Sequence, residues 1–140
     1  MYLHYFETYT RMKYTRIDKE LFISNRKNFI NKMEGSSLAV FNSNDIYPIS
    51  ADSTMPFQQH RDIFYLSGVD QEESILVISP NSKNEAHKEV LFLKETNEHI
   101  AVWEGEKLTK EAAFETSGIK TVYWLNQFDT IFKHMMCEVD

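Results

Sequence analysis

Apolar residues recur at helical spacing near the start of the chain. They follow Asp18 and form one stripe made of Phe22, Ile23, Phe29, Ile30 and Met33. Such a stripe predicts an amphipathic helix that packs through a single face. The Asp18 carboxylate can accept from the free N–H groups at the helix start, and Gly35 can adopt the left-handed conformation that ends a helix. We therefore expect the first helix between these two residues.

Five short apolar runs farther along the chain predict strands. They lie at residues 38–41, 63–66, 75–78, 90–93 and 121–125. These runs do not alternate apolar with polar residues, which is typical of strands covered on both faces. Helices are expected from about Thr109 to Thr116, with Gly118 as the stop, and from about Asn126 onward. The pattern indicates an α/β domain in which a sheet is layered with helices, with a long loop at residues 47–59.

Composition and charge restrict the class of protein. The 140 residues are 42% hydrophobic, which suits one globular domain. The formal net charge of -6 disfavours nucleic acid and anionic membrane as partners. No window approaches the roughly 18 apolar residues of a membrane span, and the start of the chain does not resemble a signal peptide. The single cysteine allows no internal disulfide, so we expect a cytoplasmic location.

The first 17 residues differ from the rest of the chain. They are aromatic and charged, and we interpret residues 1–17 as an N-terminal extension and residues 18–140 as the domain. Two interpretations of the extension stay open, since its aromatic residues can pack on the domain or be ordered only by a partner. These residues are Tyr2, Tyr5, Phe6, Tyr9 and Tyr14.

The sequence does not assemble an active site. The histidines are scattered and favour surface or structural roles: His4, His60, His87, His99 and His134. Cys137 lies on an amphipathic segment, where a core or boundary position is commoner than a nucleophile. Glu72 and Glu73 follow a turn and are expected in a solvated loop. A phosphate-binding glycine loop and a Gly-x-Ser-x-Gly elbow are both missing. We therefore expect no catalytic and no metal-ligating residue in this chain.

Two segments remain as candidates for function. One is the loop around Asp52, because long loops in compact domains often bind or catalyse, although Asp52 can equally cap a turn. The other holds Trp103 beside Gly105, just past a predicted strand end. This tryptophan belongs either to the core or to an interface, where aromatic side chains dominate binding energy.

These two segments also carry a family resemblance. The pattern Ala51-Asp52-Ser53-x-x-Pro56-Phe57-x-Gln59-x-x-Asp62-x-x-Tyr65-x-x-Gly68 resembles the signature of the aminopeptidase P N-terminal domain. An acidic turn and an apolar strand follow at residues 71–78, and Glu98 with Trp103-x-Gly105 is similar to a second family element. The resemblance covers about residues 18–135. The chain departs from the family at Gln58, where arginine is frequent, and after Trp103-x-Gly105, where only Lys107 is basic.

The resemblance implies a fold and a role. The fold is a mixed β-sheet of about five or six strands flanked by helices on both faces. The role is that of a non-catalytic N-terminal domain of an Xaa-Pro aminopeptidase, whose partners are its own C-terminal catalytic domain and further copies in a dimer or tetramer. The implied catalytic domain holds two divalent metals, usually manganese, through two Asp, one His and two Glu, none of which lies in this chain.

The family chemistry implies how this domain contributes. In the family, a metal-bridging hydroxide attacks the peptide bond that precedes proline in the second position of a peptide. The N-terminal domain helps assemble the oligomer and closes the mouth of the active site, partly that of a neighbouring subunit. Asp52 and Trp103 match the parts that reach towards this mouth. Two alternatives stay open: the same domain in a prolidase or creatinase relative, and a stand-alone interaction module.

Overall fold

The structure, a computed structural model, describes residues 15–139. Most of the predicted extension, including Tyr2 to Tyr14, therefore lies outside the described residues. A four-stranded sheet has the order β1-β4-β5-β6, formed by β1 (Ala39–Asn42), β4 (Ile75–Ile78), β5 (Glu89–Leu93) and β6 (Thr121–Trp124). β4 is antiparallel to both neighbours, whereas β5 and β6 are parallel, so the sheet is mixed as expected.

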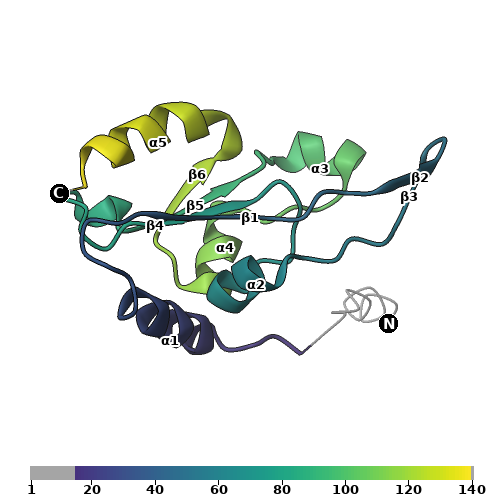
Figure 1. Ribbon diagram of the computed structural model, residues 1–140. Coiled ribbons are helices and arrows are strands. Elements are labelled where there is room, and N and C mark those ends of the chain that lie inside the picture. Colours follow the sequence, from purple (N-terminus) through teal and green to yellow (C-terminus); the bar gives the residue numbers. More distant parts are fainter. Residues whose placement is uncertain (1–14, 140) are drawn as a thin grey trace, which may run out of the picture.

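Helices cover both faces of this sheet (Figure 1). One face carries α1 (Lys19–Ile30), α2 (Arg61–Ser67) and α4 (Lys110–Ser117), and the other carries α5 (Phe128–Cys137). Alternate strand residues point to opposite faces. Leu76, Ile78 and Leu91 accordingly join the core under α1, α2 and α4. Val77 and Phe92 join the second core under α5. This arrangement explains why residues 75–78 and 90–93, in the two central strands, are apolar at every position.

The predicted starts of the first helix and of α4 and the stop at Gly118 are confirmed, whereas the predicted stop at Gly35 is wrong. The first helix ends at Ile30 with Asn31 as its C-cap, and Gly35 does not adopt the left-handed conformation. Asp18 caps α1, its carboxylate accepting from Glu20 N–H at 3.0 Å. Thr109 caps α4 in the same way, and Gly118 ends α4 in the left-handed conformation with φ of 75°. The last helix begins later than Asn126, because a 3-10 turn, η2 (Leu125–Gln127), precedes α5. A second 3-10 turn, η1 (Glu85–His87), lies between β4 and β5.

Two expectations were wrong. The apolar run at residues 63–66 is helix α2 and not a strand, because His60 caps its start and Gly68 ends it with φ of 69°. Ile63 and Leu66, three residues apart, are buried while Tyr65 is exposed, which is the burial pattern of a helix. A run of four apolar residues is too short for the sequence to show this pattern. The long loop at residues 47–59 contains a two-stranded hairpin, β2 (Pro48–Ser50) and β3 (Ser53–Thr54).

A buried arginine joins three elements beneath the sheet. The Arg26 side chain on α1 is 1% exposed. Its guanidinium donates to the Leu66 carbonyl at 2.8 Å and to Glu89 at 3.1 Å. Burial lowers the pKa of Arg26, and Glu89 offsets part of this effect. None of the helices described in residues 15–139 combines the length and apolar character needed to cross a membrane.

Candidate functional site

Both candidate segments leave the sheet at the same end of its strands. β1, β5 and β6 run in one direction, so their carboxyl ends meet there, beside the start of β4. One row of residues paired across the four strands marks this end of the sheet: Asn42, Ile75, Phe92 and Tyr123. The β2–β3 hairpin follows β1, and α3 (Glu98–Glu104) follows β5. In Figure 1 the hairpin and α3 accordingly project from the same end of the domain.

The hairpin presents apolar side chains to solvent. Tyr47 is 71% exposed and Ile49 is 62% exposed, and Met55 is also largely exposed. Asp52 lies in the tight turn at the hairpin tip and is exposed. The preceding Ala51 has a φ of 47°, a left-handed conformation that is uncommon for residues with a Cβ atom. The hairpin therefore exposes apolar side chains along its strands and at its base, and Asp52 is an exposed carboxylate at its tip.

Trp103 is the most exposed large apolar side chain in the described residues, at 82%. It occupies the last turn of α3, a helix between β5 and α4, so its expected place just past a strand end is wrong. Its neighbour Val102 is 77% exposed, and α3 contains no buried residue. Of the two interpretations, the core position is excluded, because the indole ring faces solvent.

Two other residues of the resemblance pattern, Gln59 and Gly68, make contacts inside the domain. The Gln59 amide donates to the carbonyls of Val69 and Gln71 at 3.1 and 2.9 Å, and it accepts from Asn44 N–H. Gly68 ends α2 in close contact with the Phe22 ring, where a Cβ atom would come within 2.4 Å. These residues therefore orient the hairpin and α2, whereas Asp52 has no comparable internal role.

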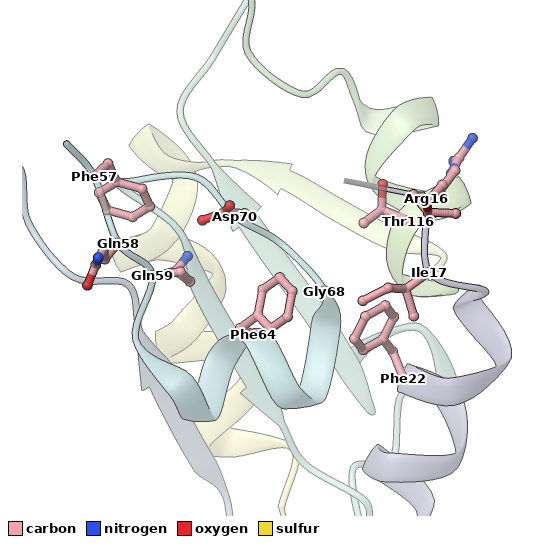
Figure 2. A pocket seen from close by; sticks show the side chains of 11 residues that line it. Arg16, Ile17, Phe22, Phe57, Gln58, Gln59, Phe64, Gly68, Asp70 and Thr116 are labelled. Atoms are coloured by element: carbon pink, nitrogen blue, oxygen red, sulfur yellow. The ribbon is translucent and has the colours of Figure 1, made fainter. Parts of the chain in front are cut away.

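A pocket of about 680 Å³ lies between the hairpin base, the first turn of α1 and the C-terminal end of α2. Figure 2 shows the rings of Phe22, Phe57 and Phe64 lining it, with the Asp70 carboxylate near Phe57 and Gln59. The rings of Phe22 and Phe64 meet edge to face, with centroids 6.0 Å apart. The pocket can accept an apolar group, but its lining contains no histidine or cysteine. Neither Asp52 nor Trp103 belongs to this lining.

Ion pairs surround the attachment of α3. Lys94 Nζ lies 3.1 Å from Glu104 and 3.2 Å from Glu73. The hydrogen bond to Glu104, followed by that to Glu73, raises the pKa of Lys94. The expectation of a solvated Glu72 was wrong, because its side chain is only 13% exposed and pairs with Lys107. Burial alone would raise the pKa of Glu72, but the Lys107 hydrogen bond and charge outweigh it, and the pKa is lowered.

The other titratable candidates are structural or exposed. His87 is buried, with Nδ1 2.6 Å from Glu138 and Nε2 3.1 Å from the Tyr123 hydroxyl. His60 caps α2, and His99 and His134 are exposed, while His4 lies outside the described residues. Cys137 is exposed, so its expected core or boundary position is wrong. Across residues 15–139, no three His, Cys, Asp or Glu side chains converge as a metal site would require.

Comparison with known protein families gives a match to the N-terminal domain of aminopeptidase P over residues 22–140. The chain is 28% identical over 100 residues to human Xaa-Pro aminopeptidase 3, covering 70% of this chain and 20% of that protein. It is 28% identical over 105 residues to the Escherichia coli K12 Xaa-Pro aminopeptidase, covering 75% and 24%. The chain thus spans about a fifth to a quarter of the length of these relatives.

Solved structures share the fold. Pseudomonas aeruginosa aminopeptidase PepP superposes with a TM-score of 0.78 at 23% identity, covering 86% of this chain and 27% of that one. Zinc-substituted E. coli aminopeptidase P in complex with product gives a TM-score of 0.74 at 24% identity, with the same coverage. At this identity the likeness concerns the fold alone. It agrees with the mixed sheet and two helical layers expected from the sequence.

Proposed function

Because this chain belongs to the aminopeptidase P N-terminal domain family, we propose that it is the non-catalytic N-terminal domain of an Xaa-Pro aminopeptidase. Its partner is a catalytic domain in the same polypeptide, acting on peptides with proline in the second position. That domain supplies metal-activated water for hydrolysis, with two divalent ions, manganese by expectation. A cytoplasmic location and a division between residues 1–17 and 18–140 are parts of the same proposal.

The exposed apolar end of the domain is the observation that carries this proposal. Large apolar side chains lie in solvent on two segments, which follow β1 and β5 on either side of the start of β4: Tyr47, Ile49, Val102 and Trp103. Large exposed apolar patches mark interaction sites, and aromatic anchors dominate binding energy at interfaces. We propose that this end faces a catalytic domain and contributes to oligomer assembly as a dimer or tetramer.

Within this proposal, Trp103 and Asp52 act on substrate access and not on bond cleavage. The exposed indole is suited to narrow an opening and to contact the apolar part of a bound peptide. The exposed Asp52 carboxylate, at the hairpin tip, is suited to interact with a cationic group of the substrate or of a neighbouring subunit. Both residues therefore affect which peptides enter, while the reaction itself proceeds on groups outside this chain.

The proposal is tested first by separating this domain from the chemistry. The purified 140-residue chain with manganese should release no N-terminal residue from an Xaa-Pro peptide. Turnover that copurifies with the chain through repeated purification would overturn the non-catalytic assignment.

Kinetics of the full-length enzyme test the access role. Trp103→Ala should raise KM for peptides longer than three residues by about 5- to 30-fold, since an aromatic side chain that becomes covered on binding contributes about 1–2 kcal/mol. Asp52→Asn should change KM with peptide charge, and kcat for a short substrate should stay near wild type. Exposed Lys133 on α5 gives the matched control, Lys133→Ala. Unchanged kinetics and oligomeric state for Trp103→Ala would contradict the proposal.

A further inference from the structure

The helix that carries Trp103 is attached to the domain in an unusual way. None of the seven residues of α3 is buried, so the helix has no apolar anchor in either core. A hollow of about 440 Å³ lies against it, lined by Ile100 and Glu104 of α3 together with Lys94, Glu95, Leu125 and Asn126. Apolar packing gives most helices in proteins their stability. Other contacts must therefore fix the orientation of α3.

Polar contacts at both ends of residues 94–108 supply this attachment. They all involve three consecutive residues, Gln71, Glu72 and Glu73, which we name the anchor run. Glu73 pairs with Lys94 at 3.2 Å, at the start of the segment. Glu72 pairs with Lys107 near its end, and Gln71 Oε1 accepts from Leu108 N–H at 2.8 Å. The segment that includes α3 is thus held at its two ends by one short stretch of chain.

Lys94 connects the anchor run directly to the Trp103 helix. Its ammonium group contacts Glu73 on one side and Glu104, the residue after Trp103, at 3.1 Å on the other. Glu73 has a φ of 52°, which is costly for a residue with a Cβ atom. Such a conformation persists only where surrounding contacts hold it. Gln71 itself is buried, so the anchor run is fixed to the domain and can serve as a reference point for α3.

We infer that Lys94 and Lys107 are positioning residues, which set the orientation of Trp103 by clamping the α3 segment to the anchor run. The inference rests on the proposed function for the role of Trp103, but the clamp itself is a property of this chain. The two ion pairs of Lys94 are partly exposed, whereas the Glu72–Lys107 pair is mostly buried. Because salt screens exposed ion pairs, the order of α3 should fall as ionic strength rises. The packing of the two apolar cores should not change with ionic strength.

Amide exchange measured by NMR on the 140-residue chain tests the clamp directly. The reporters are Ala101 and Gly105, whose N–H groups bond to carbonyls within or next to α3. Lys94→Met should speed their exchange by about two- to fivefold, the effect of losing one or two partly exposed ion pairs. Lys94→Arg, which keeps the charge and can still bridge both carboxylates, should restore slow exchange.

Two further measurements separate positioning from general stability. In Lys94→Met the amides of the core strand β5 should exchange as in wild type, and Lys133→Met on α5 should leave α3 unchanged. In a Trp124→Phe background, where Trp103 is the one tryptophan left, its fluorescence anisotropy should fall in Lys94→Met. Added 1 M salt should lower the anisotropy by a similar amount in the Trp124→Phe protein that keeps Lys94, and should change it little once Lys94→Met is also present.

The outcomes are distinct. Unchanged α3 exchange and anisotropy in Lys94→Met and Lys107→Met would overturn the clamp, and faster exchange throughout β5 would reduce Lys94 to a general stability role. In the full-length enzyme, Lys94→Met should raise KM for long peptides as Trp103→Ala does, with kcat for a short substrate kept. If Lys94→Met loosens α3 but leaves the kinetics unaltered, the clamp stands and the access role is refuted. If α3 stays rigid in Lys94→Met while Trp103→Ala changes the kinetics, the access role stands and the clamp is refuted.

Discussion

Gly68 is the residue of the resemblance pattern whose replacement has the most readily calculated cost. Gly68→Ala adds a Cβ atom at a φ of 69°, where L-residues lose about 1–2 kcal/mol. The added atom would also lie 2.4 to 2.9 Å from three atoms of the Phe22 ring. Phe22 is buried at 3% exposure, so relief requires displacement of a packed ring, which costs about a further 1–3 kcal/mol. We expect a total destabilisation of about 2–5 kcal/mol.

Two other glycines of the chain provide matched controls. Gly118 has nearly the same backbone conformation, with φ of 75°, but an added Cβ would meet the half-buried side chain of Ile23. Since an aliphatic side chain can change rotamer more easily than a buried ring, Gly118→Ala should cost only about 1–3 kcal/mol. Gly35 has open space around it, so Gly35→Ala should lie within about 0.5 kcal/mol of wild type.

Urea denaturation of the 140-residue chain, followed by circular dichroism, measures these differences. The order of destabilisation should be Gly68, then Gly118, then Gly35. A double-mutant cycle isolates the ring contact. The loss in the free energy of unfolding caused by Phe22→Leu should be smaller by at least about 1 kcal/mol in the Gly68→Ala protein than in the wild-type protein. Equal costs at Gly68 and Gly118, together with a coupling energy near zero, would refute the argument from close packing.

Three further stability effects follow from the buried polar groups. Arg26→Met should cost about 1–3 kcal/mol in urea denaturation, because it leaves the Leu66 carbonyl without its donor; a loss under 0.5 kcal/mol would contradict this. His87→Ala should cost about as much and expose the end of α5 to faster amide exchange, since Glu138 loses its partner; unaltered exchange there would count against the network. The lowered pKa of Glu72 means that its pairing with Lys107 stabilises the fold above the ordinary value of 4.5 and is lost as pH falls through the lower folded value. The stability difference between wild type and Glu72→Gln should therefore shrink on acidification below about pH 4.5, and a constant difference would refute the assignment.

The sheet and its helical layers could be predicted from the sequence because burial on both faces leaves a direct trace. Residues 75–78 and 90–93 are apolar at every position, and each lies within a central strand. Capping residues were equally informative, as Thr109 and Gly118 bound α4. The run at residues 63–66 was misassigned because four apolar residues satisfy both a strand and one turn of a buried helix. The flanking His60 and Gly68, as cap residues, were the signal that favours the helix.

The candidate site was less accessible to sequence reasoning. The exposure of Trp103 depends on α3 lacking a buried face, and an isolated tryptophan beside a glycine does not reveal this. The anchor run was missed for a similar reason, since its partners lie 21 to 37 residues away and pair only after the sheet has formed. Position after a turn predicts a solvated Glu72, and nothing in the residues next to Lys107 identifies it as the partner of Glu72. Charge pairing across such separations has no local signature.

We propose above that Trp103 lies at an active-site mouth formed with a catalytic domain. Replacing Trp103 by the photoreactive residue p-benzoylphenylalanine in the full-length enzyme tests this most directly, with Lys133 replaced in the same way as the control. Irradiation should crosslink position 103, but not position 133, to the catalytic domain of a neighbouring subunit, and a bound Xaa-Pro peptide should suppress the crosslink. Crosslinks absent at position 103, or formed equally from position 133, would contradict the account.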